Sequence, residues 1–74
     1  MSNCNIDHSL ADVKGKLAQQ SSYLPGEVLS SITTYLKKGI ASQDELNEIF
    51  HLLKKYDLSS EDEQMLRDEK LKKY

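Results

Sequence analysis

Apolar residues recur every three or four positions along most of the chain, which is the spacing of one face of an α-helix. The strict alternation of a half-buried strand does not persist anywhere, so the pattern predicts an all-α fold. The prediction rests on three apolar stripes, whose members are Leu10, Val13 and Leu17; Val28, Leu29, Ile32, Tyr35 and Leu36; and Leu46, Ile49, Phe50, Leu53 and Tyr56.

Residues that favour helix ends flank these stripes. Pro25 suits the first position of a helix, where its missing N–H is no loss, and Gly39 can adopt the left-handed conformation that ends one. Ser42 and Glu45 have the spacing of a capping box, in which each side chain accepts a hydrogen bond from the other residue's backbone. These signals predict both ends of the second helix and the start of the third.

A fourth helix is predicted from its caps and charges more than from an apolar stripe. It starts within residues 59–63, where either Ser60 with Glu63 or Ser59 with Asp62 has capping-box spacing. Glu63 also precedes Arg67 by four residues, which favours an ion pair on the helix surface. The apolar residues of this segment form no clean stripe, and they are Met65, Leu66, Leu71 and Tyr74. Such a helix can stand largely in solvent or fray.

Together these signals predict helices at about residues 9–20, 25–38, 43–56 and 60–72, after a flexible segment at residues 1–8. We expect a small antiparallel three- to four-helix bundle, built on a central hairpin of the second and third helices. Gly15 lies inside the first helix, where glycine costs about 1 kcal/mol relative to alanine. It either permits close approach of another helix or weakens the segment.

The composition limits the classes of protein that remain. The 74 residues form one small domain with 38% apolar residues and a formal net charge of -2. No apolar run approaches the ~20 residues that cross a bilayer, and the first residues do not resemble a secretion signal. A single cysteine, Cys4, cannot form an internal disulfide. We therefore expect a cytoplasmic protein that does not bind membranes.

No pattern typical of catalysis or cofactor binding is present. Cys4, Asp7 and His8 are close in sequence, but a metal site needs three or four ligands in a fixed geometry. The other histidine, His51, is expected at a surface or boundary position, and no calcium-loop pattern begins at Asp57. We expect no enzymatic activity, no cofactor, no metal and no small-molecule ligand.

Nucleic-acid binding is weighed because the turn at residues 39–42 has the length of a helix-turn-helix turn. The helix that follows opens with Gln43, Asp44 and Glu45, whereas a recognition helix usually offers basic or amide side chains there. The negative net charge also differs from the basic footprint of a DNA-binding protein. We therefore expect no direct contact with nucleic acid.

By elimination, the sequence favours a protein–protein interaction module that acts as an adaptor, inhibitor or regulator. Its partner is another protein or a second copy of the chain. Two alternatives stay open, which are a small dimeric transcriptional regulator or DNA-associated protein, and a helical bundle like those of bacteriocin immunity proteins. Aromatic and methionine residues are enriched at the centres of interfaces. The candidate contact residues are Tyr35, Phe50, Leu52 and Met65.

Overall fold

The computed structural model describes residues 7–74. Within this range the chain is helical and contains no strand. Its elements are α1 (Leu10–Gln20), α2 (Gly26–Lys37), α3 (Gln43–Leu53), the one-turn 3-10 helix η1 (Tyr56–Leu58) and α4 (Glu61–Leu71). The predicted fold class, a small all-α bundle, is confirmed. The flexible segment expected at residues 1–8 falls mostly on residues 1–6, which lie outside the described part, as does Cys4.

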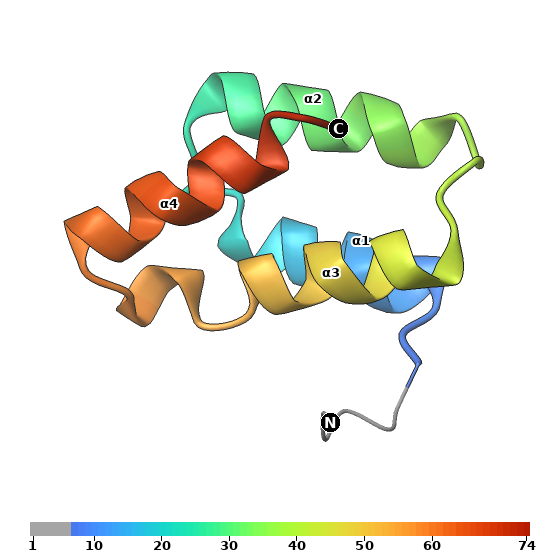
Figure 1. The fold of residues 1–74 in the computed structure, drawn as a ribbon, viewed down its shortest axis with the longest axis horizontal. Coiled ribbons are helices and arrows are strands. Elements are labelled where there is room, and N and C mark those ends of the chain that lie inside the picture. Colours follow the sequence, from blue (N-terminus) through green and yellow to red (C-terminus); the bar gives the residue numbers. More distant parts are fainter. Residues whose placement is uncertain (1–6) are drawn as a thin grey trace.

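The helices α2 and α3 run antiparallel, and the other two helices bridge them (Figure 1). The most extensive contact in the bundle is between α1 and α3, and α1 also packs on α2. From the other end of the chain, α4 contacts both α3 and α2. The two helices of the predicted hairpin, α2 and α3, are therefore held together mainly through their contacts with α1 and α4.

The core consists of the apolar stripes seen in the sequence. Val13, Val28, Ile32 and Ile49 have no exposed surface, and each helix contributes at least one fully buried residue. Burial of one such side chain is worth about 1.5–3 kcal/mol. The buried apolar residues are Val13, Leu17, Leu24, Val28, Ile32, Leu36, Leu46, Ile49, Leu53, Tyr56 and Leu71.

Serine is the N-cap residue of three of the four α-helices among residues 7–74, at positions 9, 42 and 60. The Ser42 side chain accepts from the backbone N–H of Glu45, whose carboxylate accepts from the backbone N–H of Ser42, so the predicted capping box is confirmed. At α4 the cap is Ser60, which accepts from the backbone N–H of Glu63. Pro25 precedes the first residue of α2 instead of occupying it, because its ψ of 145° is extended.

The helix ends agree with the prediction at α2 and differ at α3. Gly39 has a φ of +69°, the left-handed conformation expected after α2. The third helix was predicted to run to Tyr56, but α3 ends at Leu53. Lys54 is extended and Lys55 is left-handed, with a φ of +59°. The resulting turn brings Tyr56 into the core, where it is 1% exposed.

No helix among the described residues has the length and apolar character needed to cross a bilayer.

Candidate interaction surfaces

A groove lies between α1 and α2. Its volume is about 330 Å³, and its lining is mainly apolar. Leu17 and Leu36 reach into the core at 7% and 1% exposure, while Leu29 is half-buried. Ala18 and Thr33 complete this part of the lining. The groove therefore presents apolar surface at the outside of the bundle, where no other described helix covers it.

Two lysines flank this groove, one on each helix. Lys14 of α1 and Lys37 in the last turn of α2 are both exposed and line the groove beside the apolar residues. No acidic residue lines it. The local charge is therefore positive, although the formal net charge of the chain is -2. This charge favours an acidic segment over a basic one as the occupant.

The exposed residues of α1 next to the groove have small side chains or none. A Cβ atom added at Gly15 would meet no atom within 4 Å, and the exposed residue Ala18 lies one turn further along. No contact inside the described chain therefore requires a glycine at position 15. The open side of α1 can accept the close approach of another backbone.

A second hollow lies between α3 and α4, with a volume of about 430 Å³. Its apolar part comes from Leu52, which is half-buried, and Leu66, which is 59% exposed. Charged groups of both signs surround these leucines, in contrast to the groove between α1 and α2. The polar lining residues are Glu48, His51, Glu63, Arg67 and Lys70.

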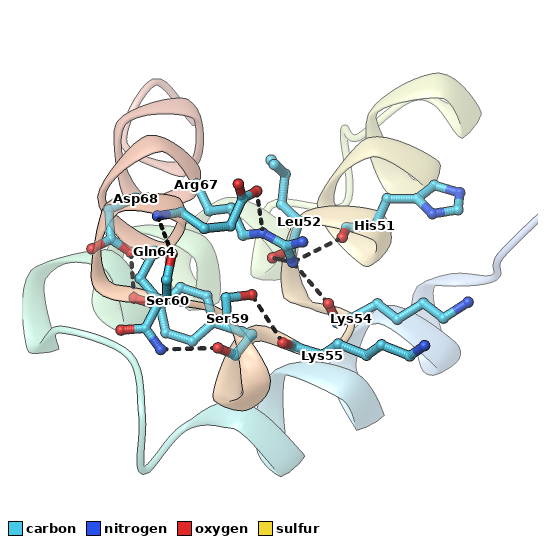
Figure 2. A network of polar contacts seen from close by, with 11 residues as sticks. His51, Leu52, Lys54, Lys55, Ser59, Ser60, Gln64, Arg67 and Asp68 are labelled. Atoms are coloured by element: carbon cyan, nitrogen blue, oxygen red, sulfur yellow. Dashed lines mark hydrogen bonds and ion pairs between the residues drawn. The ribbon is translucent and has the colours of Figure 1, made fainter.

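Arg67 joins the two walls of this hollow, which we call the α3–α4 hollow (Figure 2). Its Nη1 atom donates to the carbonyl oxygens of Lys54 at 2.7 Å, Leu52 at 3.0 Å and His51 at 3.5 Å. The last carbonyls of a helix have no partner within the helix, and a guanidinium supplies several donors in one plane. The Nε atom of Arg67 also donates to Glu63 at 3.1 Å, so the predicted ion pair forms.

A second set of contacts fixes α4 to the turn after α3. Tyr56 donates from its hydroxyl to Asp68 at 2.6 Å, and Gln64 donates to the carbonyl oxygen of Tyr56 at 2.9 Å. Burial, and then the hydrogen bond to the Asp68 carboxylate, raise the pKa of Tyr56 well above its ordinary value. The imidazole of His51 extends away from this network (Figure 2). Both walls of the α3–α4 hollow are thus held in place by polar contacts.

The segment before α1 lies on α3 and covers Phe50. The imidazole of His8 stacks on the Phe50 ring, with centroids 3.6 Å apart and planes 10° apart. The backbone N–H of His8 donates to Asn47 at 2.9 Å, and Gln43 donates to the carbonyl oxygen of His8 at 2.8 Å. The ring of Phe50 is therefore already packed against this chain.

Tyr35 is engaged by the other end of the chain. Its hydroxyl donates to Glu45 at 2.7 Å, and its ring lies against Tyr74, with centroids 5.2 Å apart. The hydrogen bond between Tyr35 and Glu45 raises the pKa of the phenol and lowers that of the carboxyl group. Tyr74 donates in turn to Glu48, and burial followed by this bond raises its pKa. These contacts attach the chain end to α2 and α3.

The four residues proposed from the sequence as partner contacts therefore lie at separate places. Leu52 lines the α3–α4 hollow, and Met65 is 63% exposed on α4, beside Leu66. Tyr35 packs with Tyr74, and Phe50 packs with His8. The sequence pattern does not indicate that Lys14 and Lys37 are neighbours, because their proximity arises only when α1 and α2 pack together.

Metal ligands do not gather in the described part of the chain. Among residues 7–74, no group of three or more His, Cys, Asp or Glu side chains could hold a metal ion. Asp7 accepts from the Asn47 side chain at 3.2 Å, and His8 is stacked as described above. The third member of that sequence cluster, Cys4, lies outside the described residues.

Comparison with known proteins adds no relative: no protein-family model, curated protein or solved structure matches this chain.

Proposed function

We propose that this chain is a protein–protein interaction module without catalytic activity, and that the groove between α1 and α2 binds an amphipathic helix of its partner. The observation behind this proposal is an apolar groove of about 330 Å³ with a lysine on each side. The chain is small and has a single cysteine, whereas small secreted domains usually contain several disulfides. These two features favour a cytoplasmic adaptor or regulator.

The lining determines the chemistry of the partner segment. Leu17, Leu29 and Leu36 favour leucine, isoleucine, methionine or phenylalanine side chains spaced three or four residues apart on one helix face. Lys14 and Lys37 favour an aspartate or glutamate at the edge of that face. The partner segment is thus an acidic amphipathic helix.

The small residues of α1 favour a helix over a loop as the occupant. Ala18 lines the groove, and the exposed Gly15 lies one turn before it, outside the lining. Neither residue carries a long side chain that would keep a second helix axis away from α1. The glycine costs about 1 kcal/mol of helix stability. A docked helix would account for the glycine at position 15, which no contact within the described residues requires.

A pull-down from native lysate, carried out with and without nuclease, tests this function. The groove variant is Ala18→Glu, which places a bulky acid in the groove at an exposed helical position. The matched control is Gln19→Glu, because Gln19 is an exposed neighbour on α1 that does not line the groove and the change in charge is the same. Circular dichroism establishes that both variants fold.

We expect a stoichiometric protein partner that is retained by the wild type and by Gln19→Glu and is lost by Ala18→Glu. Neutralising both Lys14 and Lys37 to glutamine should weaken its capture, and more so at low ionic strength. Capture that disappears with nuclease, a partner that Ala18→Glu retains, or the absence of any specific partner would each refute this function.

A further inference from the structure

The segment before α1 lies on one face of α3, where side chains of α3 hold it. Gln43, Asn47 and Phe50 are spaced four and three residues apart, so they lie on the same face of the helix. Each of the three contacts His8, and Asn47 also contacts Asp7. We call the surface formed by Gln43, Asn47 and Phe50 the α3 face. Because a segment of the same chain occupies it, the contacts show which kind of segment this face accepts.

The two amide side chains of the α3 face bind the main chain of this segment. The backbone N–H of His8 donates to Oδ1 of Asn47 at 2.9 Å, and the carbonyl oxygen of His8 accepts from Nε2 of Gln43 at 2.8 Å. The same Nε2 atom donates to Oδ1 of Asn47 at 3.0 Å, which orients the two amides. Main-chain hydrogen bonds of this kind give affinity for a non-helical segment of any sequence, and side-chain contacts give specificity.

Side-chain contacts determine which residues fit this face. The imidazole of His8 lies flat on the Phe50 ring, with planes 10° apart, so Phe50 offers a surface for a planar ring. The ring of His51 borders the same place, because its centroid is 5.6 Å from that of His8 and the two planes are 82° apart. The carboxylate of Asp7 accepts from Nδ2 of Asn47 at 3.2 Å. The α3 face therefore favours an acidic residue followed directly by a residue with a planar ring.

The segment can leave the α3 face without disturbing the core. Asp7 and Ser9 are exposed, His8 is half-buried, and none of the three belongs to the apolar core. The hydrogen bonds that Gln43 and Asn47 donate to this segment are exposed to water. Regions with few buried contacts and exposed hydrogen bonds open at a lower free energy than the rest of a fold. A competing segment therefore has to displace only these contacts.

We propose that the α3 face is a peptide-binding site for a non-helical segment of a partner protein, in which an acidic residue precedes a planar ring. Asp7 and His8 occupy the site intramolecularly until that segment displaces them. They lower the apparent affinity for the partner, because only molecules with an open α3 face can bind. The α3 face shares no residue with the groove between α1 and α2, so this site is additional to the function proposed above.

Nuclear magnetic resonance of the full chain tests the proposal, because the side-chain amide signals of Gln43 and Asn47 report directly on the α3 face. The probe is a peptide with blocked ends and the sequence of residues 5–10, which is Asn-Ile-Asp-His-Ser-Leu. The variant His8→Gly weakens the intramolecular occupant, since it removes the ring that stacks on Phe50 and no core residue.

Two double variants in the His8→Gly background locate the binding site. Adding Asn47→Ala removes an acceptor for the main chain and a donor for the acidic residue. Adding Asp44→Ala is the matched control, because Asp44 is exposed on the same helix and makes no hydrogen bond to the segment. Circular dichroism establishes that all variants fold.

We expect the peptide to shift both amide signals of His8→Gly in a saturable manner. The wild type should bind about two- to tenfold more weakly, because its own ring competes for Phe50. Asn47→Ala should cost at least about fivefold in affinity, followed at Gln43, whereas Asp44→Ala should have no effect. The proposal is overturned if His8→Gly shows no saturable shift across the millimolar range, if the wild type binds equally well, or if Asn47→Ala changes nothing.

Two altered peptides test the requirement for a ring. Glycine in place of the peptide's histidine should weaken binding to His8→Gly by about two- to tenfold, and phenylalanine should not, because Phe50 stacks with any planar ring. Equal affinities of the glycine and histidine peptides overturn the proposed specificity. Adding Ala18→Glu should leave these titrations unchanged, so loss of this site and loss of the groove partner can be told apart.

Discussion

Replacing Arg67 with methionine should destabilise the fold by about 2–3 kcal/mol. Methionine keeps much of the apolar stem and removes the guanidinium. The change breaks the bonds to the carbonyl oxygens of Lys54 at 2.7 Å and Leu52 at 3.0 Å, together with the longer contact to His51. A hydrogen bond to a charged group contributes about 1.5–3 kcal/mol. Because the Arg67 side chain is 21% exposed, water can replace part of that value, and the low end applies to each bond.

The loss is large for a domain of this size. A stability of 0.05–0.15 kcal/mol per residue gives roughly 4–11 kcal/mol for the whole chain. Urea unfolding followed by far-UV circular dichroism measures the change as a shift in midpoint at constant slope. In thermal unfolding, each 1 kcal/mol corresponds to about 4–8 °C at this length.

Two further variants separate the carbonyl contacts from the ion pair. Glu63→Gln removes only the exposed salt bridge with Arg67, so it should cost less than about 1 kcal/mol. Arg67→Lys keeps the charge but lacks the planar set of donors, so it should recover only part of the loss. The reasoning fails if Arg67→Lys is as stable as the wild type, or if Glu63→Gln costs as much as Arg67→Met.

The structure also predicts the direction in which stability changes for two other substitutions and for a rise in pH. Lys55→Gly should stabilise the fold by about 0.5–1 kcal/mol, because Lys55 holds a φ of +59° that glycine adopts without strain; a loss of stability in urea would contradict this. Gly15→Ala should raise the thermal midpoint by an amount equivalent to about 1 kcal/mol, since the added Cβ meets no atom within 4 Å; an unchanged midpoint would count against it. Stability should fall as pH rises above about 10, because the folded state raises the pKa of Tyr56 and so binds a proton that the unfolded chain releases. The fall should be smaller in Tyr56→Phe, and urea titrations from pH 8 to about 11 compare the two proteins.

Features that depend on neighbours in sequence were predictable. The three apolar stripes identified most of the core, because a helix places residues three and four apart on one face. The cap formed by Ser42 with Glu45 and the left-handed Gly39 also involve groups only a few residues apart. In each case the deciding contact is made within one turn of helix.

Features that depend on distant contacts were not predictable. The apolar stripe of α3 continues to Tyr56, and no glycine marks its true end at Leu53. The termination involves Arg67, which lies 13 residues beyond Lys54 and binds its carbonyl oxygen. Lys55 adopts the left-handed conformation that the sequence pattern assigns to glycine. Similarly, the residue type of Phe50 suggests a partner contact, but its ring is stacked on His8, which lies 42 residues earlier in the chain.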